Sequence, residues 1–135
     1  MPHGKPVKLD FAQTSIQQFI AQEIGRTSQQ ENQVVVGHRF DLALLKEFML
    51  EVDKQISKGV EIDSIRFYHG LNVRSGGTTP EYDLIIVPTL KNGKDCEEVY
   101  QKIDEISPLI LGESTPCPNV CQTGTKTINC ISEST

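Results

Sequence analysis

Two cysteines near the C-terminus are the residues whose type and spacing best suggest chemistry. They enclose the run Cys117-Pro118-Asn119-Val120-Cys121. A redox-active pair needs a thiol whose pKa is lowered, commonly by a helix N-terminus or a nearby cation. The usual oxidoreductase motif also has two intervening residues and follows a strand in a β-α-β unit. Neither feature is found here, so the sequence argues against a thiol-redox function but keeps it as an alternative.

The same cysteines have the ligand type that zinc prefers. A structural zinc site needs four nitrogen or sulfur ligands in a tetrahedral array. The candidate ligands in the chain are Cys117, Cys121, Cys130, Cys96, His38 and His69. The ligand types are present, but no second cysteine pair with a recognised knuckle spacing occurs. Zinc binding is therefore kept as a second alternative and is not favoured. The favoured interpretation is structural, with no cofactor: the cysteines pack as small hydrophobes or form one disulfide in a C-terminal loop.

The other candidate residues lie in a strand-like run, Ile62–Leu71. Side-chain alternation places Arg66 and Tyr68 on one face of this strand and His69, with Phe67, on the other. Arg and Tyr are favoured at interaction hot spots, although both are also ordinary solvated residues of a sheet. His69 has the chemistry of a general base, but a hydrolase would need an acid or nucleophile within reach of its ring. Arg66, Tyr68 and His69 are therefore the candidate binding residues.

Two amphipathic helices are expected to position these residues. The first is predicted over Ser15–Ile24, with a capping box that begins at Thr14 and a stop at Gly25. The second is predicted to begin after Asp41 and to end at Gly59. Its predicted apolar stripe consists of Leu42, Leu45, Phe48, Met49, Val52 and Ile56.

Three strands are predicted between and after the helices. A short strand at Val34–Val36 is expected to end at Gly37. The runs Ile62–Leu71 and Tyr82–Val87 are expected to pair as an antiparallel hairpin. Glycine, serine, threonine and proline between them predict a mobile loop over residues 72–80.

The rest of the chain has weaker patterns. Residues 1–8 are interpreted as a loose arm, and Lys91–Lys94 as a turn around Asn-Gly. A third helix is predicted over Asp95–Ile106. Residues 107–135 are interpreted as an irregular segment containing cysteines, with weak strand character at Thr125–Ile131.

The order of these elements predicts an α+β fold. It lacks the regular strand–helix alternation of a doubly wound sheet. We therefore expect one domain over residues 1–135, with a small antiparallel sheet, two main helices on one face and the irregular C-terminal segment. Apolar residues make up 37% of the chain and charged residues 23%, which is typical of a chain that folds.

Charge and hydropathy limit the expected partners. The formal net charge of −5 argues against nonspecific nucleic-acid binding and against an anionic membrane surface. The chain shows no signal-peptide pattern and no apolar segment of about 20 residues, so the cytoplasm is expected, where most cysteines stay reduced. The favoured function is a noncatalytic interaction or structural module that binds another protein or forms a homodimer. The alternative is a thiol-redox or zinc protein using Cys117 and Cys121.

Several runs of the chain resemble a known group of proteins. These runs are Ser64–Asn72, Leu84–Pro88, Lys91–Asp95 and Cys117–Cys121. Together they resemble a group of small uncharacterised bacterial α+β proteins that have two amphipathic helices, a hairpin and a terminal Cys-Pro-x-x-Cys segment. The resemblance covers about residues 40–121, and the linker over residues 73–81 is longer than the tight turn of that group. No established activity comes with this resemblance, and it implies no catalytic residue.

Overall fold

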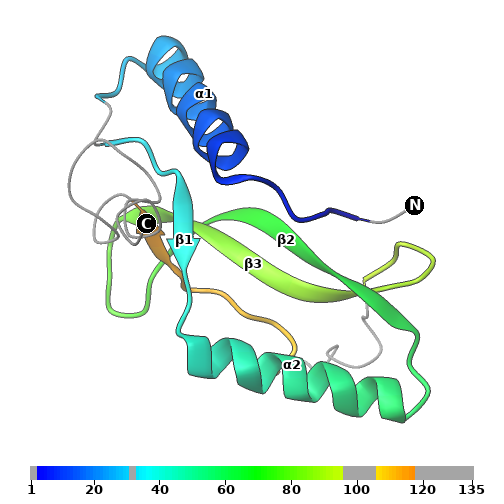
Figure 1. Cartoon of the computed structure of the whole chain (residues 1–135). Coiled ribbons are helices and arrows are strands. Elements are labelled where there is room, and N and C mark those ends of the chain that lie inside the picture. The colour runs from blue at the N-terminus through cyan, green and yellow to red at the C-terminus, as the bar shows by residue number, and fades with distance from the viewer. Residues whose placement is uncertain (1–2, 31–32, 96–105, 118–135) are drawn as a thin grey trace. The chain divides into compact units, whose positions relative to one another are not determined.

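The computed structural model describes residues 3–30, 33–95 and 106–117. Within them the chain is α+β, as predicted, with two helices and two small antiparallel two-stranded sheets. The chain forms two compact units, residues 1–38 with 116–135 and residues 39–115. The elements are α1 (Leu9–Thr27), β1 (Gly37–Arg39), α2 (Leu42–Ser57), β2 (Ile62–Val73), β3 (Pro80–Leu90) and β4 (Thr115–Cys117) (Figure 1). No helix in the described residues combines the length and apolarity needed to cross a membrane.

Helix α1 is longer than predicted at both ends. It follows Lys8, which makes no side-chain cap, and it ends where Ser28 adopts a left-handed backbone and donates its N–H to the Ile24 carbonyl at 2.9 Å. The predicted capping box at Thr14 and the predicted stop at Gly25 are therefore wrong. A glycine inside a helix costs only about 1 kcal/mol relative to alanine, so Gly25 alone does not end it.

Strand β1 was predicted a few residues too early. It begins at Gly37, the residue that was expected to end it. Its partner is β4, and Val36 just before it donates its N–H to the Cys117 carbonyl at 2.7 Å. A partner strand more than 70 residues away decided the position of β1. The local run of valines did not.

Helix α2 confirms the second predicted helix. It begins after Asp41, although the Asp41 side chain makes no capping hydrogen bond, and it ends two residues before Gly59. Phe48 and Val52 are buried, whereas much of the predicted stripe remains open. The members of the stripe that stay largely exposed are Leu42, Met49 and Ile56. A helix that packs on a narrow two-stranded hairpin buries only a narrow stripe.

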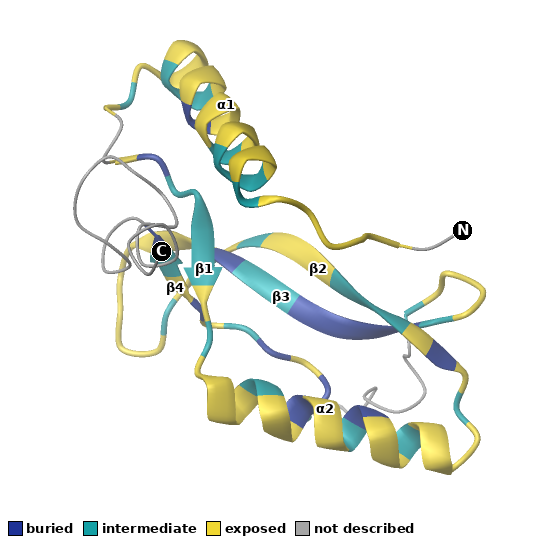
Figure 2. Cartoon of the chain, viewed as in Figure 1, coloured by how far each residue is buried: buried dark blue, intermediate teal, exposed yellow. Residues whose placement is uncertain are grey.

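The core of residues 39–115 lies between α2, the β2–β3 hairpin and a segment that follows residue 105. Its buried members are Phe48, Val52, Ile62, Ile86, Leu109 and Leu111 (Figure 2). Leu111 and Ile86 exchange two backbone hydrogen bonds, of 2.9 and 3.1 Å, so this segment pairs along the free edge of β3. Residues 107–111 were predicted to be irregular, and they form no helix or strand, but the structure also places Leu109 and Leu111 in the core.

The hairpin is confirmed, and its strands are longer than predicted. The register runs from Ile62 opposite Leu90 to Val73 opposite Pro80. Most of the predicted loop over residues 72–80 is therefore a short turn between the strands, in which Gly77 N donates to Arg74 O at 2.9 Å. The second predicted turn, Lys91–Lys94, is also present. Gly93 there has φ of 84°, a left-handed backbone that glycine adopts without steric cost.

Two predicted elements cannot be compared with the structure. The third helix was predicted over Asp95–Ile106, and only its two end residues belong to the described part of the chain. Asp95 forms an isolated bridge with Thr89 there, and Ile106 is exposed. The strand predicted at Thr125–Ile131 lies outside the described residues.

Candidate functional site

Near the turn that joins β2 to β3, one face of the hairpin carries apolar side chains and the other carries polar ones. Residues directly opposite each other in an antiparallel pair have their side chains on the same face. His69 is opposite Leu84, and Leu71 is opposite Tyr82. Phe67 and Val73 alternate with these two along β2, so they lie on the same face. We call this surface the apolar face. It consists of Phe67, His69, Leu71, Val73, Tyr82 and Leu84.

The apolar face is largely open to solvent. The exposed fractions are 57% for Phe67, 66% for Leu71, 50% for Val73 and 57% for Tyr82. Farther along the same face, Ile65 and Ile86 belong to the core that α2 covers. Figure 2 shows this division, with the second half of β2 exposed and the second half of β3 buried. An apolar surface thus continues the core beyond the part that α2 covers, and it consists of Phe67, Leu71, Val73 and Tyr82.

The opposite face of the hairpin buries a carboxylate, on Asp83. Ser114 donates both its backbone N–H, at 2.9 Å, and its hydroxyl, at 2.6 Å, to Asp83 Oδ1. Asn72 Nδ2 and the Glu113 backbone N–H each donate to Oδ2 at 2.8 Å. We call these four residues the carboxylate cluster: Asn72, Asp83, Glu113 and Ser114. The cluster fastens the segment after Leu111 to β3.

A cation also approaches this carboxylate. Arg74 Nη1 lies 2.8 Å from Asp83 Oδ2, but its orientation does not satisfy hydrogen-bond geometry. We therefore assign Arg74 an electrostatic contribution, and its other contacts hold it in place. Its Nη2 donates to the Tyr82 carbonyl at 2.8 Å, and its Nε donates to Glu81 at 3.3 Å. Arg74 thus pairs with a buried acid at the tip of the hairpin.

The environment of Asp83 favours the charged carboxylate. Burial by itself raises the pKa of Asp83. The hydrogen bonds from the Ser114 hydroxyl, the Asn72 amide and the backbone of Ser114 and Glu113 outweigh burial and lower this pKa well below its ordinary value. A carboxylate that is already fully hydrogen-bonded inside the fold is suited to holding structure together. It has little remaining capacity to bind a ligand or transfer a proton.

Local backbone geometry makes the carboxylate cluster possible. Glu113 has a positive φ of 52°, which turns the chain so that two successive N–H groups point at Asp83. The preceding Gly112 passes so close to β3 that a Cβ atom there would lie 2.9 Å from Ile85 Cδ1. Because Cδ1 is the far end of the Ile85 side chain, a small shift of that side chain would accommodate a Cβ atom at position 112.

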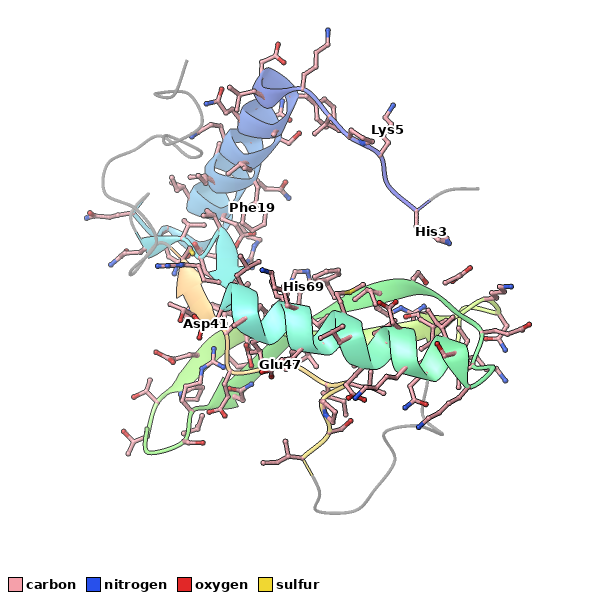
Figure 3. All side chains as sticks on the ribbon, turned by 60° about the horizontal axis from the view of Figure 1, so that its bottom comes forward. His3, Lys5, Phe19, Asp41, Glu47 and His69 are labelled. Atoms are coloured by element: carbon pink, nitrogen blue, oxygen red, sulfur yellow. The ribbon has the colours of Figure 1, made fainter. Side chains whose placement is uncertain are left out.

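Arg66 and Tyr68, two of the predicted binding residues, form a separate polar cluster. Arg66 donates to Asp95 at 3.0 Å and to the Gly93 carbonyl at 2.8 Å, and the Tyr68 hydroxyl donates to Asp95 at 2.6 Å. These contacts hold the Lys91–Lys94 turn against β2. His69, labelled in Figure 3, is on the other face of the strand and is exposed. The three predicted residues therefore do not form one continuous surface.

The cysteines give no metal centre in the described part of the chain. Cys117 at the end of β4 is buried and disulfide-bonded. The other three cysteines, Cys96, Cys121 and Cys130, lie outside the described residues. Among residues 3–30, 33–95 and 106–117, no three His, Cys, Asp or Glu side chains gather as metal ligands do. At Cys117 the structure thus has the disulfide that the structural interpretation included, and not the reduced thiol expected for most cysteines of a cytoplasmic chain.

The disulfide can be checked by a thiol count. Because one disulfide consumes two of the four cysteines, protein that is denatured and alkylated without reductant should carry at most two labels. Intact-mass measurement with and without prior reduction gives the number directly. Four labels without reductant would show that Cys117 is a free thiol, and zinc analysis of the same sample would then test the metal alternative.

Comparison with protein-family models, curated proteins and solved structures found no match to this chain. Function must therefore be argued from the geometry. The sequence contained signals for both features that the prediction missed. Alternation placed Phe67 with His69 on one face of the strand, but an exposed apolar surface was not predicted there. Asp83 stands inside an apolar strand, which is the usual sign of a buried charge that has partners.

Proposed function

We propose that the protein is a noncatalytic protein-interaction module and that its apolar face is the contact surface. The observation that supports this proposal most directly is the exposure of Phe67, Leu71, Val73 and Tyr82 on one face of the hairpin. The four side chains expose roughly 400 Å² of mostly apolar surface, if each large side chain has about 150–250 Å² in total. Patches of this size on soluble proteins often mark interaction sites.

The contacts on the other face of the hairpin also support the proposal, because they hold the backbone of the contact surface in a fixed conformation. The carboxylate cluster and Arg74 hold the face opposite the contact surface. A partner would therefore meet side chains on a strand whose backbone is already ordered. Such preorganisation lowers the entropy cost of association. The surface also contains two aromatic residues, Phe67 and Tyr82, and aromatic side chains contribute strongly to the binding energy at interfaces.

A paired substitution tests this function. Leu71→Asp places a charge in the apolar face, whereas Leu50→Asp places the same charge on α2 at a position of similar exposure, 62%. Tagged wild-type and variant proteins would be incubated with extract of the source cells. Every retained protein, including untagged copies of the chain, would then be quantified by mass spectrometry. We expect Leu71→Asp to reduce specific retention at least about tenfold, because an unpaired charge would be desolvated on binding.

The control variant decides the interpretation. Leu50→Asp should retain the same proteins as the wild type, and circular dichroism should show that both variants stay folded. Equal retention by Leu71→Asp and Leu50→Asp would show that the apolar face is not a contact surface. Loss with both variants would likewise contradict the assignment, because the effect would not be specific to the hairpin.

A further inference from the structure

We infer that the partner of the apolar face is the same face of a second copy of this chain, in a reversible face-to-face dimer. This inference rests on the proposed function. Charge is the first argument. Between Ile65 and Val73, the residues of β2 on this face and their partners on β3 include no Asp, Glu, Lys or Arg. A two-fold contact sets a surface against its own copy, so a face with a net charge would repel itself.

The rest of the chain makes this face the suitable one for self-association. Each copy has a net charge of −5, so two copies repel each other on average. A contact through an uncharged face keeps the acidic residues out of the interface. Packing of one open sheet face on another is also the standard way in which two sheets bury their apolar sides. Added salt should therefore strengthen the dimer, because salt screens the repulsion between the two acidic copies and leaves the apolar contact intact.

Area indicates the size class of the interface. The roughly 400 Å² contributed by the four exposed side chains is about half of the approximately 800 Å² per partner in a standard stable interface. An interface of this size belongs to the weak and transient class. The expected dissociation constant is therefore on the order of 10–100 μM, which makes the dimer reversible at ordinary concentrations.

The first test is sedimentation velocity of the full chain from about 5 to 500 μM, a range chosen to span this dissociation constant. We expect the wild type and Leu50→Asp to shift from monomer to dimer with the same midpoint, and the midpoint to fall when NaCl is raised. Leu71→Asp should raise the dissociation constant at least about 50-fold, because the charge would be buried without a partner. Wild-type protein that stays monomeric up to the highest concentration would overturn the dimer.

Mixing two charge variants tests whether the contact is between like faces. Leu71→Asp and Leu71→Lys should each be monomeric alone, since each dimer would bury two like charges. An equimolar mixture should dimerise at least about fivefold more tightly than either variant, because one Asp then faces a copy that carries Lys. A mixture no tighter than its components would overturn the like-face contact.

Sedimentation velocity and the retention experiment with cell extract together separate the dimer from the function on which it rests. A monomeric wild type together with extract proteins whose retention depends on Leu71 would overturn the dimer and leave the interaction function standing. A monomeric wild type without such proteins would overturn both. Retention of the chain's own untagged copy, lost with Leu71→Asp and kept with Leu50→Asp, would support both.

Discussion

Replacement of Asp83 by Asn is expected to lower the free energy of unfolding by roughly 3–5 kcal/mol, the usual cost of removing one member of a buried charged pair. Asparagine keeps the shape of the side chain, but its NH₂ group would face donors where a carboxylate oxygen now accepts. Ser114, Glu113 or Asn72 would then lose an acceptor, and Arg74 would keep only the more exposed Glu81 as a counter-charge. Urea denaturation followed by circular dichroism measures the change.

Asp63→Asn is the matched control for this experiment. Asp63 is also in the hairpin, but it is exposed and its carboxylate accepts a hydrogen bond only from the neighbouring Ser64 in the described structure. Its replacement should change the free energy of unfolding by no more than about 0.5 kcal/mol. If Asp83→Asn were as mild as Asp63→Asn, the carboxylate cluster would contribute nothing to stability.

The pH dependence of stability should come from the same carboxylate. The pKa of Asp83 is lower in the folded chain than in the unfolded chain, where it is about 3.9. The unfolded state therefore binds a proton first as the pH falls, and this favours unfolding. The contribution of Asp83 is fully present above about pH 5 and is lost progressively below about pH 4. The stability difference between wild type and Asp83→Asn should be constant from pH 5 to 7 and should shrink at lower pH.

Elements that are determined by residues within their own segment were predicted from the sequence, and elements that depend on distant partners were not. Helix α2 and the hairpin follow from periodicity and alternation within the segments themselves, and both were predicted correctly. Strand β1 depends on pairing with β4, far along the chain, so the local run of valines pointed to the wrong residues. The ends of α1 were missed for a similar reason, since a single Thr or Gly is weak evidence of where a helix begins or ends.

The candidate site was predicted only in part. Alternation correctly assigned Phe67 and His69 to one face of β2 and Arg66 and Tyr68 to the other. It could not show which face would be covered, because cover depends on where α2 and the segment after residue 105 pack. Arg66 and Tyr68 were selected for their residue types, yet their contacts with Asp95 are structural. The exposed apolar face became visible only when the extent of the core was known.

Replacement of Leu109 by Ala is expected to lower the free energy of unfolding by about 2–5 kcal/mol, the range for truncating a buried leucine. Leu109 is almost fully buried in the core beside Phe48 and Ile86. The matched control is the adjacent Ile110→Ala, which removes a similar side chain from a position 39% exposed and should cost less than about 1 kcal/mol. Urea denaturation of both variants gives the difference.

The same measurement tests whether the segment after residue 105 docks as one unit. Leu109 and the carboxylate cluster hold neighbouring parts of this segment, at the core and at β3. If they act together, the Leu109→Ala and Asp83→Asn effects should not add, and the double variant should differ from their sum by about 0.5–3 kcal/mol. Simple additivity would show that the two contacts hold the segment independently. Equal effects of Leu109→Ala and Ile110→Ala would contradict the docking of Leu109 in the core, and the attachment of this segment would then rest on the carboxylate cluster and the Leu111–Ile86 backbone pair.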